Sequence, residues 1–300
     1  MNQIIQTMNL SAYLKEQTSL INKELDKLIP EKDVPHGLLY KAARYSLMAP
    51  SKRLRPILTL ATAKMLGASS KTALLPACAL ELVHTYSLIH DDLPSMDDDH
   101  LRRGKPTLHK VYPEGQAILA GDFLLTLAFE TLTNVPSLTA EQKISLVSTL
   151  SQRSGSKGMI GGQVMDLFSE GKTLSLETLQ QIHSYKTAAM IMASVEFGGI
   201  VAQATKKEMD SLRIFGQDIG LAFQIIDDIL DVTSSDGELG KPVGSDHAKN
   251  KATYISILGY EQSNKIAKKL CHSALNSLSQ LSCDTSILSS LADLIISRSS

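Results

Sequence analysis

The sequence has few cysteines and no pattern that would use them. Cys78, Cys271 and Cys283 are the three thiols of this 300-residue chain, and none belongs to a CxxC pair or to a cluster with histidines. Disulfide frameworks and zinc sites need such pairs or clusters. The cysteines therefore argue against both and predict a protein of a reducing, cytoplasmic environment.

The chain also lacks an excess of charge of either sign. Its 30 Lys and Arg residues balance 31 Asp and Glu residues, so no overall charge favours nucleic acid or an acidic membrane surface. Neither a signal sequence nor an uninterrupted apolar run of about 18 residues is evident. We therefore expect no nucleic-acid partner and no membrane insertion, and any recognition by charge must be local.

Strand signals, linkers and internal repeats are missing as well. Apolar residues recur with a period near 3.6 in almost every segment, and 43% hydrophobic residues suffice for a large core. This predicts an all-α fold, a single large helical bundle forming one domain over residues 1–300, with residues 1–9 loose. The expected helices span residues 10–28, 36–48, 52–66, 71–92, 114–133, 139–154, 156–168, 175–184, 186–204, 207–233, 251–281 and 284–297.

Five aspartates are crowded into the segment 91–99: Asp91, Asp92, Asp97, Asp98 and Asp99. Two carboxylates about 4 Å apart repel by roughly 4 kcal/mol at an effective dielectric of about 20. Pro94 should end the preceding helix near Asp92, so the following loop can fold Asp97 back toward it. The cluster favours a hard divalent cation, and an ordinary acidic surface loop is the alternative.

A second acidic cluster lies inside an apolar run from Ile219 to Val232. Asp227 and Asp231 are four residues apart and share one helical face, with Asp228 beside them. Solvent exposure does not explain three acids among residues that require burial. Two such clusters on two helices predict a metal-lined cleft with Asp91, Asp92, Asp97, Asp227, Asp228 and Asp231 as ligands.

Two motifs now resemble those of a known family. Asp91-Asp92-x4-Asp97 with Arg102-Arg103-Gly104, and Gln224-x2-Asp227-Asp228-x2-Asp231, are similar to the aspartate-rich motifs of the trans-prenyltransferases. These all-α enzymes condense isopentenyl diphosphate with an allylic diphosphate such as dimethylallyl or geranyl diphosphate. The resemblance implies Mg²⁺ as cofactor, with about three ions per site, and a homodimer.

The resemblance also implies which residues bind isopentenyl diphosphate. Lys52 and Arg55, in Ser51-Lys-Arg-Leu-Arg-Pro56, match the family's basic diphosphate-binding element, although Ala49-Pro50-Ser51 replaces its glycines. His84 and Arg103 would join them. Guanidinium groups suit phosphate oxygens and stay charged at any working pH. His90 is interpreted as structural.

A further set would handle the allylic substrate and catalysis. By resemblance, Arg102 and Lys186 hold the allylic diphosphate, Thr187 faces the incipient cation with Gln224, and Lys241 and Lys251 close over the diphosphate. Gln163 and Asp166, in a segment similar to GxxGGQxxD, are second-rank candidates, because packing explains the glycines equally well.

Product length is predicted from the residues before the first motif. Tyr86 precedes Asp91 by five residues, about 7.5 Å along a helix, and Ser87 is its small neighbour. A helical wheel places Ser87 rather than Tyr86 beneath Asp91, so geometry alone does not identify the stop. An aromatic residue at this position resembles the farnesyl-making pattern, which predicts a C15 product.

Several alternatives stay open. The chain could be a geranylgeranyl diphosphate synthase, or a non-catalytic partner subunit, although such subunits usually lose an aspartate motif. A di-iron bundle would need Glu and Glu-x-x-His motifs that these helices lack. A histidine-aspartate phosphohydrolase could use His90-Asp91 but leaves the second acidic cluster unexplained.

Overall fold

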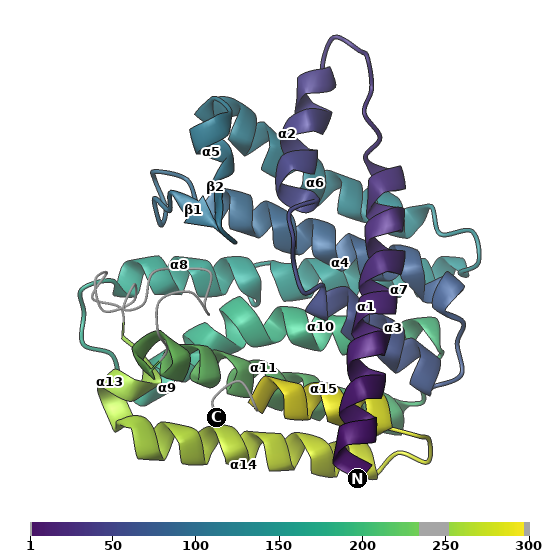
Figure 1. Cartoon of the computed structure of the whole chain (residues 1–300), viewed down its shortest axis with the longest axis vertical. Helices are drawn as coiled ribbons and strands as arrows, with labels where there is room; N and C mark the ends of the chain where they lie inside the picture. Colours follow the sequence, from purple (N-terminus) through teal and green to yellow (C-terminus); the bar gives the residue numbers. More distant parts are fainter. Residues whose placement is uncertain (1, 234–251, 297–300) are drawn as a thin grey trace.

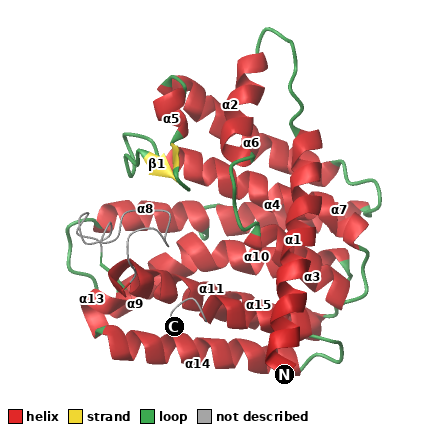
Figure 2. Cartoon of the chain, in the orientation of Figure 1, coloured by secondary structure: helices red, strands yellow, loops and turns green. Residues whose placement is uncertain are grey.

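The computed structural model describes residues 2–233 and 252–296 and is all-α apart from one short hairpin (Figures 1 and 2). The hairpin pairs β1 (Leu101–Arg102) with β2 (Lys105–Pro106). The helical elements are α1 (Asn2–Leu28), α2 (Gly37–Leu47), α3 (Leu54–Met65), α4 (Ser70–Asp91), α5 (Leu108–Val111), α6 (Glu114–Thr133), α7 (Ala140–Ser154), α8 (Met159–Ser169), α9 (Leu176–His183), η1 (Ser184–Ala188), α10 (Ala189–Val201), α11 (Lys206–Thr233), α13 (Tyr254–Leu258), α14 (Tyr260–Ser279) and α15 (Ser286–Ile296).

The long helices lie in successive layers. α6 packs on α4, α4 on α10, α10 on α11 and α11 on α14, and Figure 1 shows these helices following one another from the top of the view to the bottom. α3 closes the space between α4 and α10, and α1 crosses the layers while packing on α4 and α3. The core therefore runs through the middle of the bundle, along α4 and α10.

Several helices begin at a side-chain cap, close to the start that the sequence pattern predicts. The Ser69 hydroxyl accepts a hydrogen bond from the Thr72 backbone N–H, and Ser175 does the same for Thr178. Thr139 and Gln142 form a capping box at the start of α7. Such caps satisfy backbone donors that a helix leaves unpaired, and each typically contributes about 1 kcal/mol.

Besides shifts of one to three residues at many helix ends, the described residues differ from the prediction in four places. α1 begins at Asn2 rather than Leu10. α5 and the hairpin were not predicted. The helix expected over residues 251–281 is divided at Gly259, whose φ of 77° is left-handed and ends α13 before α14 begins. The helices expected over 175–184 and 186–204 are joined through the π-helical turn η1 instead of being separated.

Within residues 2–233 and 252–296, two helices, α4 and α6, are long and apolar enough to cross a membrane by length and composition. Within the protein, 78% of the apolar window of α4 is buried, compared with 39% for that of α6. The burial of α4 is that of a core helix, and much of its apolar character serves the packing of the bundle.

Gly198 tests how tightly this core is packed. A Cβ atom on Gly198 would lie 2.5 Å from the Thr62 Cβ and 2.8 Å from the Thr59 carbonyl oxygen of α3. We predict that Gly198→Ala lowers the free energy of unfolding by about 2 kcal/mol, because overpacking outweighs the better helix propensity of alanine. Urea unfolding followed by circular dichroism measures the change.

The matched control is Gly115→Ala in α6, where an added Cβ meets nothing within 4 Å. It should leave stability unchanged or raise it slightly. Equal stability of the two variants would show that α10 and α3 are not in close contact at Gly198.

Candidate active site

The first acidic motif sits where α4 ends. Asp92 is the C-terminal cap of this helix, and the loop folds back so that the Asp97 backbone N–H donates to the Asp91 carbonyl oxygen at 2.8 Å. This return of Asp97 confirms the expected course of the loop. The pKa of Asp91 is raised to about 6, chiefly by burial; Lys186 opposes this rise and nearby Asp97 adds to it.

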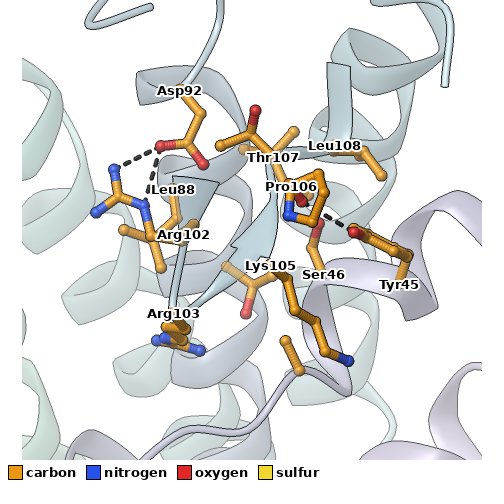
Figure 3. Close-up of a pocket in the computed structure, with 13 residues that line it drawn as sticks. Tyr45, Ser46, Leu88, Asp92, Arg102, Arg103, Lys105, Pro106, Thr107 and Leu108 are labelled. Atoms are coloured by element: carbon orange, nitrogen blue, oxygen red, sulfur yellow. Dashed lines mark hydrogen bonds and ion pairs between the residues drawn. The ribbon is translucent and has the colours of Figure 1, made fainter. Parts of the chain in front are cut away.

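Arg102 is fixed beside this motif. Its Nε donates to Asp92 Oδ1 at 3.0 Å, and its Nη2 bonds to the same oxygen and to Asp99 Oδ2 at 2.9 Å. Figure 3 shows Arg102 turned toward Asp92. One oxygen of Asp92, predicted as a metal ligand, therefore already accepts an arginine.

The hairpin aims both arginines. Arg103 and Gly104 form its turn and both have positive φ, 54° and 74°, as a two-residue turn of type I′ requires. The Tyr45 hydroxyl of α2 donates to the Pro106 carbonyl oxygen at 2.9 Å and ties the hairpin to the bundle (Figure 3). Arg102 and Arg103 also line a pocket that is formed by α2, α4 and the hairpin.

A second cationic region surrounds His84. Its pKa is well below the usual value, first because the ring is buried and then because of Arg55, Arg103, Arg102 and Arg53, in that order. Burial also lowers the pKa of Arg55 to about 10 and that of Arg103. A neutral histidine among guanidinium groups is a favourable environment for a polyvalent anion.

The turn η1 presents Lys186 and Thr187. Gly162 of α8 lies against the backbone of η1, since a Cβ on Gly162 would be 2.3 Å from the Lys186 backbone nitrogen. Gly220 of α11 is equally close from the other side, with a Cβ 2.5 Å from the Ala188 Cα. The Lys186 ammonium pairs with Asp166 at 2.6 Å. Two glycines thus give the π turn the space that it needs.

Thr187 begins a chain of hydrogen bonds into the second motif. Its hydroxyl donates to Gln224 Oε1 at 2.9 Å, and Gln224 Nε2 donates to Asp228 Oδ1 at 3.2 Å. Asp228 Oδ2 accepts the backbone N–H of Tyr254 at 2.9 Å. Asp228 is buried and, like Asp92, has oxygens occupied by protein donors.

The structure gathers most of the predicted residues in one region. Lys186 influences Asp91, and Asp227 influences Arg55, which also lies near Arg103. The first motif, the cations and the second motif therefore share one electrostatic environment, in which Asp231 is buried and Gln163 is buried without a hydrogen-bond partner for its amide. Lys52 is exposed. Lys241 and Lys251 lie outside the described residues.

Mg²⁺ suits these donors. It prefers octahedral oxygen ligands and usually combines one or two carboxylates with water and phosphate oxygens. Among the described residues, no three Asp, Glu, His or Cys side chains are grouped to hold an ion by themselves. The half-buried Asp91 beside Asp97 fits an ion that a diphosphate helps to bind.

Sequence reasoning missed Arg53, Glu81 and His183. Arg53 and Glu81 form an ion pair of 2.6 Å with side chains only 1% and 2% exposed. Glu81 is an isolated acid in the apolar α4 segment, three residues before His84, and this isolation could have indicated the ion pair. The His183 ring lies 5.5 Å from that of Tyr254, and burial lowers its pKa to about 4; no motif marked it.

The comparison with protein families decides the affiliation. A family model described as Polyprenyl synthetase matches residues 36–290. The chain belongs to the polyprenyl synthetase family. The all-α architecture is accordingly the isoprenoid synthase fold of these prenyltransferases, and the resemblance found in the motifs is confirmed.

Curated relatives and solved structures agree on this family. A geranylgeranyl diphosphate synthase of Cyanophora paradoxa is 44% identical over 97% of either chain. A farnesyl diphosphate synthase of Escherichia coli is 43% identical over 97% of this chain and 99% of its own. The apo crystal structure of an FPP/GFPP synthase from Zymomonas mobilis superimposes with a TM-score of 0.86 at 36% identity, covering 96% of this chain and 99% of that one.

We predict that Gly162→Ala reduces prenyl transfer at least about tenfold, because the added methyl group displaces the backbone of Lys186 and so misaligns a substrate contact. Steady-state kinetics at saturating substrates measure the loss. Gly115→Ala, which adds a methyl group to an open helix position, should retain full activity.

Asp91 gives a pH dependence with a definite sign. Its pKa in the folded, metal-free protein is about 6 against 3.8 for the ordinary group, so the fold gains a proton, and stability, as the pH falls through 6. Asp91→Asn carries no charge at any pH. In EDTA, its stability advantage over the wild type should be larger at pH 7.5 than at pH 5 by on the order of 1 kcal/mol.

Urea unfolding at the two pH values measures this difference. An advantage that is the same at both would mean that the Asp91 carboxylate is hydrated rather than buried.

Proposed function

We propose that the protein is a Mg²⁺-dependent prenyltransferase that condenses isopentenyl diphosphate with dimethylallyl and geranyl diphosphate to give farnesyl diphosphate. The observation that carries this proposal is the presence of two cationic regions beside the acidic motifs. One consists of Arg102 and Lys186 next to Asp91. The other consists of Arg55 and Arg103 around His84. Two diphosphates need two such regions.

The allylic diphosphate belongs with Arg102, Lys186 and the carboxylates. Asp91, Asp97 and Asp227, with Asp231, would hold about three Mg²⁺ ions together with the phosphate oxygens. Ions held there would supply positive charge to the leaving diphosphate. Asp92 orients Arg102, and Asp228 orients Gln224, through the hydrogen bonds already described.

The chemistry that follows is ionisation, condensation and elimination. Loss of diphosphate leaves an allylic cation. The Thr187 hydroxyl donates its hydrogen bond to Gln224, so its oxygen lone pairs are left to face this cation. Isopentenyl diphosphate is held by Lys52, Arg55, His84 and Arg103, and its double bond attacks the cation. The departed diphosphate takes the proton whose loss forms the new double bond. Lys241 and Lys251 are assigned to closing over the diphosphate by sequence resemblance.

Tyr86 supports a short product. Its side chain is buried, its hydroxyl has no hydrogen-bond partner, and its ring packs edge-on against that of His90 at 5.6 Å. The pKa of Tyr86 is raised to about 12, first by burial and then by the negative charge of Asp91. The ring therefore lies near the first motif. We assign Tyr86, with Ser87 beside it, as the element that stops chain growth at C15.

The alternatives meet specific observations. Relatives named for farnesyl and for geranylgeranyl diphosphate are almost equally similar, so a geranylgeranyl product is the main competitor. His90 Nε2 lies 3.0 Å from the Ile118 carbonyl oxygen and the ring lies over Gly121, which argues against a phosphohydrolase ligand. A non-catalytic subunit gives no reason for two intact motifs.

We also propose a homodimer in the cytoplasm. The faces of α6, α7 and α8 expose large apolar side chains, among them Leu119 at 59%, Ile144 at 70% and Phe168 at 73%. Exposed apolar side chains of this size suit burial against a second copy. The three cysteines are free thiols, as a reducing compartment allows.

The test of function is turnover by the purified protein with labelled isopentenyl diphosphate and either allylic substrate. Product chromatography should show C15 diphosphate with Mg²⁺ and none with EDTA, and Asp91→Asn should lose most activity. Binding without turnover under all these conditions would favour the partner-subunit alternative, and a C20 product the geranylgeranyl synthase.

The assignment of Tyr86 makes a separate prediction. Tyr86→Ala should lengthen the main product to C20 or beyond, because removing the ring opens space below the first motif. Tyr13→Ala, which removes a partly buried tyrosine of α1, should leave the product length unchanged. An unaltered C15 product from Tyr86→Ala would remove this residue as the stop.

A further inference from the structure

Arg53 is a buried arginine with a partner for each of its nitrogens. Nη1 donates to Glu81 Oε1 at 2.6 Å, Nη2 to the Leu47 carbonyl oxygen at 2.6 Å, and Nε to Asn22 Oδ1 at 2.9 Å. These acceptors belong to α4, to the end of α2 and to α1. A single guanidinium group therefore joins three helices at a fixed point, which its planar geometry makes rigid.

The backbone of Arg53 is held as firmly as its side chain. Its φ of 47° is left-handed, and it is the N-cap of α3. A non-glycine residue in this conformation costs free energy and persists only when its surroundings impose it. The preceding Ala49, Pro50 and Ser51 contain no glycine, so the side-chain contacts of Arg53 hold the chain at this turn.

The residues on either side of Arg53 are the ones assigned to isopentenyl diphosphate. Lys52 precedes it and is exposed, and Arg55 follows it in the first turn of α3. Glu81 lies on α4 three residues before His84, which belongs to the same substrate site. The Ser51 hydroxyl also approaches Glu81 Oε1, at 3.4 Å. The ion pair thus connects the two elements that supply this site.

The charges explain why the pair is placed here. An unpaired carboxylate next to a diphosphate would weaken binding, and an unpaired guanidinium group would be costly to bury. Pairing removes both problems and leaves Arg55 and Arg103 to face the anion. Arg53 and Glu81 do not need to touch the substrate for this purpose.

We propose that the buried Arg53–Glu81 pair is the positioning element of the isopentenyl diphosphate site, setting the turn that carries Lys52 and Arg55 against the helix that carries His84. This inference rests on the proposed function and names residues that the family resemblance did not assign. It makes them positioning residues rather than substrate contacts.

Two conservative variants test the proposal by a split between kinetic constants. Arg53→Lys keeps the charge but loses the three-point contact. Glu81→Gln removes the negative charge near the anion, so electrostatics alone would lower the KM for isopentenyl diphosphate, whereas loss of positioning raises it. We expect both variants to raise this KM about tenfold or more, while the KM for geranyl diphosphate changes less than about threefold.

Glu196→Gln is the matched control. Glu196 is equally buried, at 3% side-chain exposure, and pairs with Arg153 at 2.8 Å and Arg213 at 2.7 Å. It lies nine residues beyond Thr187 in the same helical run, about 13 Å along the axis. Its replacement should lower the melting temperature as Glu81→Gln does, without moving either KM.

The outcomes separate the inference from the function on which it rests. An unchanged or lowered KM for isopentenyl diphosphate in both variants, with normal wild-type turnover, overturns the positioning role. Absence of prenyl transfer in the wild type overturns the function instead. If Glu81→Gln fails to fold, Asn22→Ala removes only the Nε contact, and calorimetric titration with isopentenyl diphosphate should still show weaker binding; unchanged affinity there overturns the proposal.

Discussion

The arrangement of the site depends on compensation between buried and half-buried charges of opposite sign. Carboxylates and guanidinium groups are costly to take out of water unless they are paired or hydrogen-bonded. Asp92 is compensated by Arg102, Asp166 by Lys186 and Glu81 by Arg53. Asp91 has weaker protein compensation, and burial raises its pKa to about 6. A divalent ion held at Asp91 would relieve this residual cost.

Close packing of helices supplies the second constraint. Lys186 and Thr187 are presented by a π turn that fits between α8 and α11 because Gly162 and Gly220 leave room for its backbone. π-helical turns often occur at functional sites. Gly198 likewise allows α10 to pack closely against α3. These three glycines act by leaving out a side chain, and they fix how closely the neighbouring helices approach η1 and α3.

Solved structures with different product names share this architecture. Relatives named for farnesyl and for geranylgeranyl diphosphate are also almost equally identical to this chain in sequence. The proposed C15 product therefore rests on a few side chains before the first motif rather than on the fold. Tyr86 is the candidate because it is buried against His90 and next to Asp91. By contrast, the cations assigned to the diphosphates lie on elements with separate structural supports, such as the Tyr45 hydrogen bond to the hairpin and the Arg53–Glu81 ion pair.

The sequence by itself determined the all-α class, most helices, the two acidic motifs and the family, because helical periodicity and short motifs are local properties of the chain. It did not reveal the break at Gly259 or the continuous run through η1, where apolar periodicity is similar in broken and unbroken helices. Only the tertiary structure decided that Asp92 and Asp228 have protein partners, that His84 lies among arginines, and that Arg53 meets Glu81. Some of these pairings, such as Arg53 with Glu81 and Asp228 with Tyr254, join residues well separated in the chain, and the energies of all of them depend on burial, which exists only once the helices have packed.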